Sequence, residues 1–252
     1  MVRKWEMAIP ILTGSAKRRV YVYLPANYKR ESEKRYPVMY MFDGHNVFFD
    51  SDATYGKSWG MNDYMQRSRK QMIIVAVECN HVGNGRLREY SPFDHDNGTL
   101  GKIEGQGKLY MDWLVNTLKP RIDCNYRTLP QRENTLICGS SMGGLMALYG
   151  ACCYNHVFQR AACLSASLWV DVEKVLKFIE DADIKNDTCI YLDYGSVEMY
   201  NHTDNAKALG AATQALLDKH VDMTLRIIPG GTHCEACWEK QIPIFMECLG
   251  VQ

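Results

Sequence analysis

The chain has no net charge and no long apolar run. Its 252 residues contain 29 Lys and Arg against 29 Asp and Glu, so the formal charge at pH 7 is zero. Such a chain has no overall field that attracts nucleic acid or an anionic membrane. No apolar run reaches the roughly 18 residues that a membrane-spanning helix needs, and the opening residues lack the apolar core of a signal peptide. We therefore expect a cytoplasmic protein with a small-molecule partner and neither a nucleic-acid nor a membrane partner.

The sequence also lacks internal repeats, low-complexity tracts and a linker that would divide it. We expect one domain over residues 1–252, which is long enough to bury a substantial core. Ten cysteines are present, but most lie inside apolar segments and not in a loop-rich framework, so we expect buried free thiols. The sequence leaves open whether the chain forms a homo-oligomer.

Short apolar segments alternate with amphipathic ones along most of the chain. The segment 19–25 alternates as a half-buried strand at a sheet edge, with residues 7–12 as a candidate partner. Continuous apolar runs, typical of strands covered on both faces, follow at 37–42 and 73–77. Further strands are expected at 135–138, 161–164, 189–192 and 223–228, and helices at 109–118, 172–179, 209–216 and 238–249, where Pro243 should kink or split the last. The pattern predicts an α/β fold of three layers, with a mostly parallel central sheet and an antiparallel N-terminal edge.

One motif lies between a predicted strand and a predicted helix. Gly139-Ser-Ser-Met-Gly143 fits the pattern G-x-S-x-G, in which the central serine occupies a strained turn and the glycines let strand and helix approach closely. The strand at 135–138 and the apolar helix start at 145–149 supply the context that the motif requires. Ser141 is therefore the candidate nucleophile.

A serine hydroxyl needs a base and a group that orients that base. His233 lies in a glycine loop directly after the last predicted strand, which makes it the candidate base. In α/β-hydrolases the acid lies between the serine and the histidine in the sequence. Glu198 and Asp193 both follow the strand at 189–192; we prefer Glu198, and Asp193 stays open.

An oxyanion that develops on the substrate needs backbone N–H donors. The N–H of Met142, directly after the candidate nucleophile, is one. The loop after the strand at 37–42 supplies the other: Gly44 permits close approach of the backbone, so His45 is the first choice and Asn46 the second.

These segments resemble the putative-esterase branch of the α/β-hydrolases, which includes feruloyl and acetyl-xylan esterases, trilactone siderophore esterases and S-formylglutathione hydrolases. The resemblance covers most of the chain and is carried by residues 36–46, 123–128, 139–145, 165–169, 195–198 and 231–238. It implies an α/β-hydrolase fold and a serine carboxylester hydrolase that needs no cofactor. One departure is Glu198, because aspartate is commoner at the family's acid position.

Substrate selection should come from side chains near the triad. Trp169 and Trp59 offer aromatic surface, and Arg86 and Arg88 lie in a long glycine-containing loop at 83–107. Aromatic rings beside a polar loop suit a feruloyl or acetyl sugar ester. A trilactone siderophore ester, acyl transfer to an alcohol and a noncatalytic carbohydrate-binding scaffold remain alternatives.

The pair Cys234 and Cys237 next to His233 allows two further interpretations, a redox pair or half of a metal site. A zinc site would need a second ligand pair at comparable spacing, and a thioredoxin-like site would place the pair after the first strand of a small βαβ unit. Because the sequence shows neither arrangement, we expect no metal and no cofactor.

Overall fold

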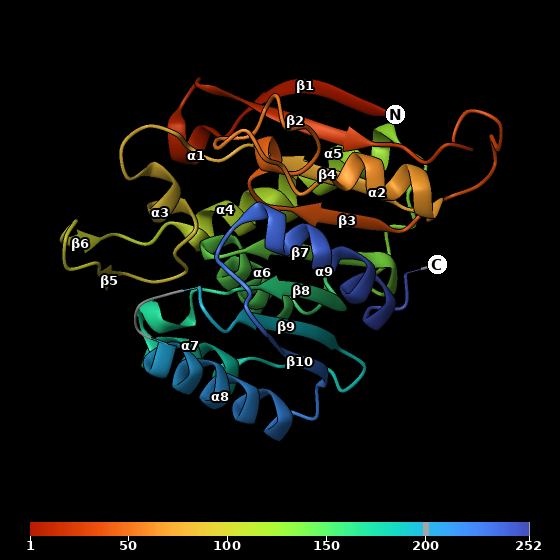
Figure 1. The fold of residues 1–252 in the computed structure, drawn as a ribbon. Helices are drawn as coiled ribbons and strands as arrows, with labels where there is room; N and C mark the ends of the chain where they lie inside the picture. Colours follow the sequence, from red (N-terminus) through yellow and green to blue (C-terminus); the bar gives the residue numbers. More distant parts are fainter. Residues whose placement is uncertain (199–201, 252) are drawn as a thin grey trace.

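The computed structural model describes residues 1–198 and 202–251, without the side chain of His202. Across these residues one sheet has eight strands in the order β1-β2-β4-β3-β7-β8-β9-β10. In that order the strands are Val2–Ala8, Lys17–Tyr23, Ile73–Val77, Val38–Met41, Thr135–Ser140, Arg160–Leu164, Cys189–Gly195 and Asp222–Ile228. Figure 1 shows the sheet face-on, with its strands in this order from β1 at the top to β10 at the bottom.

The sheet is parallel from β4 to β10 and antiparallel at its N-terminal edge. Strands β1 and β2 pair antiparallel, as do β2 and β4. All the other neighbours run parallel; β3, for example, pairs Val38 with Ile73 of β4 and with Thr135 of β7. Every residue of β3, β4 and β7 is buried. The predicted mostly parallel sheet with an antiparallel N-terminal edge is confirmed.

The edge itself differs from the prediction. The half-buried edge strand expected at 19–25 is instead the second strand, and Tyr21 and Tyr23 on its polar-looking face are 0% and 1% exposed. Its partner is Val2–Ala8 and not 7–12, because Pro10 begins the short helix α1 (Pro10–Thr13). From the sequence alone, a tyrosine can be placed on either the buried or the exposed face of a strand. Here the tertiary packing buries both rings.

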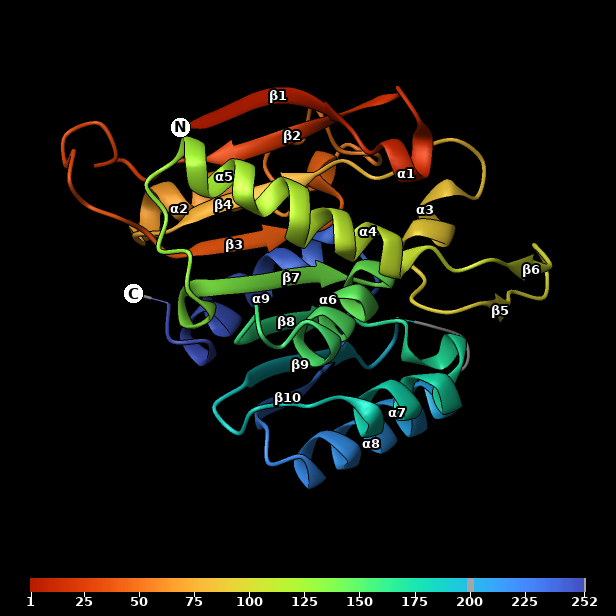
Figure 2. The same cartoon turned by 180° about the vertical axis from the view of Figure 1, so that it is seen from behind.

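Helices cover both faces of the sheet. Figure 1 shows α2 (Met61–Ser68) and α9 (Glu235–Cys248) on the near face. Figure 2 shows α4 (Gly107–Trp113), α5 (Lys119–Asn125), α6 (Met142–Cys153) and α7 (Val172–Asp181) on the other face, with α8 (His202–Asp218) beyond α7. Each face buries its own apolar cluster, so the chain forms the three layers that the pattern predicted.

Two prolines have less effect than the sequence suggests. The helix expected to end before Pro120 continues through a π-helical segment, Leu114–Leu118, into α5. Pro120 lies in the first turn of α5, where a missing N–H is best tolerated. Pro243 lies inside α9, which nevertheless runs as one helix and is not split.

Short elements gather where the parallel strands end. These are the 3₁₀ turns Gly44–Asn46 (η1) and Leu168–Val170 (η4), the helix α3 (Gly85–Glu89) and the hairpin of β5 (His95–Asp96) and β6 (Lys102–Ile103). A third 3₁₀ turn, Arg132–Asn134 (η3), precedes β7. Figure 1 shows α3 and the hairpin projecting on the left, at the carboxyl ends of the strands. Sites in parallel sheets form at this edge.

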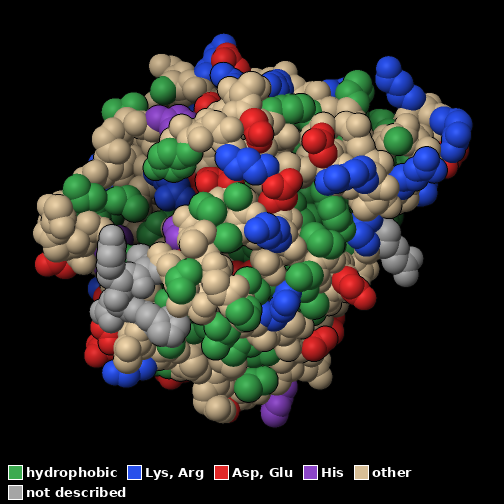
Figure 3. Space-filling model, in the orientation of Figure 1, with side chains coloured by type: hydrophobic (Ala, Val, Ile, Leu, Met, Phe, Trp, Pro, Cys, Tyr) green, Lys and Arg blue, Asp and Glu red, His purple; other side chains and the backbone are tan. Residues whose placement is uncertain are grey.

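Charges of both signs are mixed on the surface. On the face seen in Figure 3, basic and acidic side chains lie among one another, as a balanced composition implies. In the part of the chain that the structure describes, no helix combines the length and apolarity needed to cross a bilayer.

Candidate active site

Ser141 lies on a strained turn between β7 and α6. Its backbone has φ 57° and ψ −124°, a region that non-glycine residues rarely occupy. The turn is tight: a Cβ added to Gly139 would lie 2.4 Å from the carbonyl oxygen of Gly143. Glycine at both positions therefore lets the strand and the helix meet with Ser141 at the point between them.

Ser167 is the hydroxyl neighbour of this serine. The two Oγ atoms are 3.4 Å apart, and the Ser167 N–H donates to the Ser141 carbonyl at 3.1 Å. Motif reasoning did not assign Ser167 a role, although it lies in the segment 165–169 that carries the resemblance and that follows β8, the neighbouring parallel strand. Ser165 in the same segment also has a positive φ, 44°, so both loops bend sharply at this edge.

His233 and Glu198 form a hydrogen-bonded pair. His233 Nδ1 lies 3.1 Å from Glu198 Oε2, and Glu198 Oε1 accepts the Gly195 N–H at 3.0 Å. The Glu198 side chain is 1% exposed, whereas that of His233 is 27% exposed. A buried carboxylate that holds Nδ1 leaves Nε2 of an accessible imidazole for proton transfer.

Trp238 links the histidine to the serine side of the site. The His233 ring packs edge-on against the Trp238 ring at 5.1 Å. The Trp238 Nε1–H in turn donates to Ser165 Oγ at 2.9 Å. Because Ser165 belongs to the segment that contacts Ser141, helix α9 fixes the histidine loop relative to the serine turn.

Asp193, the other candidate acid, has different partners. Its carboxylate accepts the Ser165 N–H and the Tyr191 hydroxyl, both at 3.0 Å. Burial raises the pKa of Asp193 to about 7, although these two hydrogen bonds act to lower it. The contacts place Asp193 beneath the site as a structural group, and the geometry favours Glu198 as the partner of His233.

The loop after β3 lies close against β4. A Cβ on Gly44 would lie 2.7 Å from the Ala76 carbonyl carbon, and Asp43 before it adopts φ 53°. The Asn46 N–H donates to the Asp43 carbonyl at 2.8 Å, so it is already committed and His45 is the better donor for an oxyanion. Met142 is the first residue of α6, where an N–H has no partner within the helix.

A family model settles what kind of protein this is. The family described as Putative esterase matches residues 13–244. The chain belongs to the putative esterase family. The resemblance noted from the sequence motifs is thereby confirmed, and the protein is a carboxylic ester hydrolase.

Several known proteins are similar to this chain. The uncharacterized protein YbbA of Bacillus subtilis is 23% identical over 184 residues, which are 72% of this chain and 69% of YbbA. The structure of a ferulic acid esterase superposes with a TM-score of 0.69 at 19% identity, covering 98% of both chains. The siderophore hydrolase EstA of Aspergillus nidulans gives a TM-score of 0.74 at 14% identity, covering 98% of this chain and 94% of EstA. At these identities the structural likeness shows the shared fold.

Two arginines suggested as substrate contacts in this esterase are already paired. Arg86 donates to both oxygens of Asp43, at 2.7 and 2.8 Å. Burial acts to raise the pKa of Asp43, but Arg86 outweighs it and the pKa lies below its ordinary value. Arg88 pairs with Glu104 at 3.2 Å on the surface. Arg86 therefore anchors the loop that carries His45, which argues against a direct substrate contact.

The two tryptophans of the esterase differ in exposure. Trp59 is 3% exposed and packs against Trp238 at 5.9 Å between ring centroids, so it belongs to the core and is unavailable to substrate. Trp169 is 41% exposed and lines a small hollow with Glu198 and Tyr194. Of the two, only Trp169 is placed to contact a ligand.

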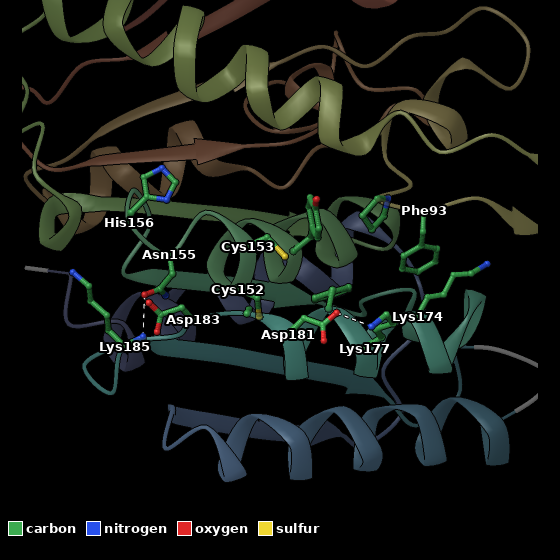
Figure 4. A pocket seen from close by; sticks show the side chains of 14 residues that line it. Phe93, Cys152, Cys153, Asn155, His156, Lys174, Lys177, Asp181, Asp183 and Lys185 are labelled. Carbon is green, nitrogen blue, oxygen red and sulfur yellow. Dashed lines mark hydrogen bonds and ion pairs between the residues drawn. The ribbon is translucent and has the colours of Figure 1, made fainter.

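A larger hollow lies elsewhere on the esterase. Its volume is about 660 Å³, and Phe93, Cys153, His156 and Lys177 are among its lining residues. Figure 4 shows these side chains around the end of α6 and along α7, where Lys177 pairs with Asp181 at the end of the helix. Neither Ser141, His233 nor Glu198 lines it, so size alone does not identify the reactive part of this molecule.

Proposed function

We propose that the protein hydrolyses carboxylic esters through an acyl intermediate on Ser141. The His233–Glu198 pair is the observation that carries the proposal, because an orienting carboxylate on Nδ1 is what a histidine base requires. The strained turn at Ser141 supports it, since this turn holds the nucleophile where a substrate can reach it.

In the first half of the reaction, Ser141 Oγ attacks the ester carbonyl while His233 Nε2 takes its proton. The N–H groups of Met142 and His45 donate to the negative oxygen that forms. The tetrahedral intermediate collapses, the carbon–alkoxide bond breaks, and His233 returns the proton to the leaving alcohol. Glu198 stabilises the imidazolium and keeps Nδ1–H directed towards itself.

In the second half, water replaces the alcohol. His233 takes a proton from the water as its oxygen attacks the acyl carbon, and then returns that proton to Ser141 Oγ as the acid departs. The cycle uses the same residues in reverse and needs neither a metal nor a thiol. The serine is free again for the next ester.

The substrate favoured by these residues is a feruloyl or acetyl sugar ester. Trp169 supports this choice, because an exposed indole beside Glu198 offers an aromatic acyl group or a sugar ring a flat apolar surface. The likeness to a ferulic acid esterase agrees with it. A trilactone siderophore ester is the second candidate, since the fold also superposes on the siderophore hydrolase EstA.

Active-site labelling tests the mechanism. A fluorophosphonate should label the wild-type protein at Ser141, and Ser141→Ala should abolish both labelling and ester turnover while the protein stays folded. Ser140→Ala alters the adjacent hydroxyl and is the matched control that should still be labelled. Labelling at another residue, or turnover in Ser141→Ala, would contradict the acyl-serine mechanism.

A substrate panel tests the specificity separately. Methyl ferulate, acetylated xylo-oligosaccharides, p-nitrophenyl acetate and a trilactone siderophore should be compared by kcat/KM. We expect the highest value for one of the first two. A siderophore value well above both would move the assignment to the second candidate without affecting the mechanism.

A further inference from the structure

Three potential metal ligands meet beside the loop that carries His45. His45 follows β3, and Cys79 and His81 follow β4, its parallel neighbour in the sheet. One ligand atom from each of these three residues lies within 4.8 Å of the other two. Two nitrogens and a sulfur from two loops thus share one small volume.

One ring nitrogen of His45, Nδ1, has no hydrogen-bond partner among the described residues. Its side chain is 4% exposed, and Nδ1 is a buried atom without a hydrogen bond to any residue in the described part of the chain. A buried polar atom left without a partner is costly, and such atoms are rare in native proteins. An ion bound at the cluster is one way to satisfy it, because an imidazole nitrogen is a metal ligand as well as a hydrogen-bonding group.

His81 is oriented as a metal ligand would be. Its Nε2 lies 3.3 Å from Glu78 Oε1, while its Nδ1 lies 3.9 Å from Cys79 Sγ. A carboxylate on one ring nitrogen fixes the tautomer and leaves the lone pair of the other directed at the metal. The His45 and His81 rings meet edge-to-face at 4.6 Å between centroids. The two imidazoles therefore already converge on the thiol.

We propose that His45, Cys79 and His81 bind one Zn²⁺ ion, with water as the fourth ligand. Zn²⁺ accepts mixed nitrogen and sulfur ligands in a tetrahedron, in which neighbouring ligand atoms lie roughly 3.3–3.6 Å apart. The three ligand atoms lie within 4.8 Å of one another, so they would need to approach by about 1 Å for this tetrahedron to form. Oxygen-preferring Mg²⁺ and Ca²⁺ do not suit a thiol and two imidazoles. Binding releases the thiol proton to solvent.

The ion has a route into the site. The side chain of His81 is 52% exposed, whereas Cys79 is 3% exposed beneath it. An incoming ion can first contact His81 and then the buried pair. The position of His81 also makes it the safest residue to change, since little packing is lost.

Zinc at this site should slow ester hydrolysis, a consequence that rests on the proposed function. His45 also supplies the proposed oxyanion donor through its backbone. A metal bound to its ring would pull on a residue of the three-residue turn η1, and a small misplacement of an oxyanion donor weakens its effect in the transition state. The metal-free protein is therefore the more active form.

Zinc binding is measured directly and without reference to activity. Reduced, chelator-treated protein is titrated with ZnCl₂ against a chromophoric chelator, and Co²⁺ serves as a spectroscopic probe for thiolate ligation. We expect one equivalent to bind, with the Kd raised at least tenfold in His81→Ala and in Cys79→Ser. Glu78→Gln should raise the Kd for Zn²⁺ about tenfold to a hundredfold. His156→Ala and Cys234→Ser change an exposed histidine and a competing thiol, and both should bind as the wild type does.

The outcomes separate this site from the esterase mechanism. Wild-type protein that binds no Zn²⁺, or His81→Ala that binds as tightly as wild type, would overturn the metal site. Loss of binding in Cys234→Ser would move the ion to the Cys234–Cys237 pair. In the activity arm, Zn²⁺ should lower kcat for p-nitrophenyl acetate in wild type and not in His81→Ala. A protein without esterase activity would still give the binding result.

Discussion

His233 and Glu198 are 35 residues apart in the sequence and joined by one contact, 3.1 Å between Nδ1 and Oε2. Glu198 reaches the ring from the loop after β9, and its second oxygen is held by the Gly195 N–H. The carboxylate is therefore fixed at both oxygens before any substrate arrives. A base whose orientation is set in advance loses little on entering the transition state.

Removal of the negative charge of Glu198 should strongly lower the rate of ester hydrolysis. Glu198→Gln keeps the size of the side chain but cannot stabilise an imidazolium or select its tautomer. We expect kcat to fall by about two to four orders of magnitude with a small change in KM. Steady-state kinetics with p-nitrophenyl acetate measures both. Asp193→Asn is the control and should retain turnover while losing stability; an inactive, folded Asp193→Asn with an active Glu198→Gln would reverse the assignment.

Asp193 should make stability depend on pH. Burial raises its pKa to about 7 from an ordinary value of 3.8. Between these values the folded chain keeps a proton that the unfolded chain has lost, so its contribution to the free energy of unfolding is lost as pH rises from about 4 to about 7, by up to about 4 kcal/mol. Urea unfolding at pH 5 and pH 8 should show Asp193→Asn much less stable than wild type at pH 5 and closer to it at pH 8. An equal gap at both pH values would refute this.

Gly44 should be sensitive to a single methyl group. A Cβ there would meet backbone atoms of Ala76 and Val77 at 2.7–2.9 Å, which cannot move aside as a flexible side chain could. Gly44→Ala should displace the His45 N–H and lower kcat about a hundredfold. Gly210 in α8 has open space around it, so Gly210→Ala should leave kcat unchanged and stabilise by about 0.5–1 kcal/mol. Kinetics and thermal melts of the two variants check this, and normal turnover in Gly44→Ala would argue against the donor.

The two tryptophans should respond in opposite ways. Trp169→Ala should raise KM for methyl ferulate several-fold more than for p-nitrophenyl acetate, because the exposed ring offers aromatic contact and is not needed for packing. Trp59→Ala removes a buried ring and should cost about 3–5 kcal/mol of unfolding free energy. Kinetic and urea-unfolding measurements on both variants distinguish the roles. Equal effects of Trp169→Ala on both esters would remove it from the binding site.

Local patterns were enough to determine the serine turn and the central strands. The glycines at 139 and 143 permit one tight connection, and the runs at 37–42 and 73–77 are apolar without alternation because both faces of the sheet are covered. The position of Ser141 directly after β7, and that of His233 in the glycine loop that follows β10, were predicted from the same patterns. These features depend on residues that are neighbours in the sequence, so they can be predicted without knowledge of the tertiary structure.

Contacts between distant segments were decided only by the tertiary structure. Arg86 is paired because the fold brings Asp43, 43 residues earlier, next to it. Trp59 is buried in part because it packs against the ring of Trp238, which is far away in the sequence. The convergence of His45 with Cys79 and His81 requires β3 and β4 to lie side by side. Sequence spacing carries no record of which loops the sheet brings together, because strand order and not chain order determines which side chains meet.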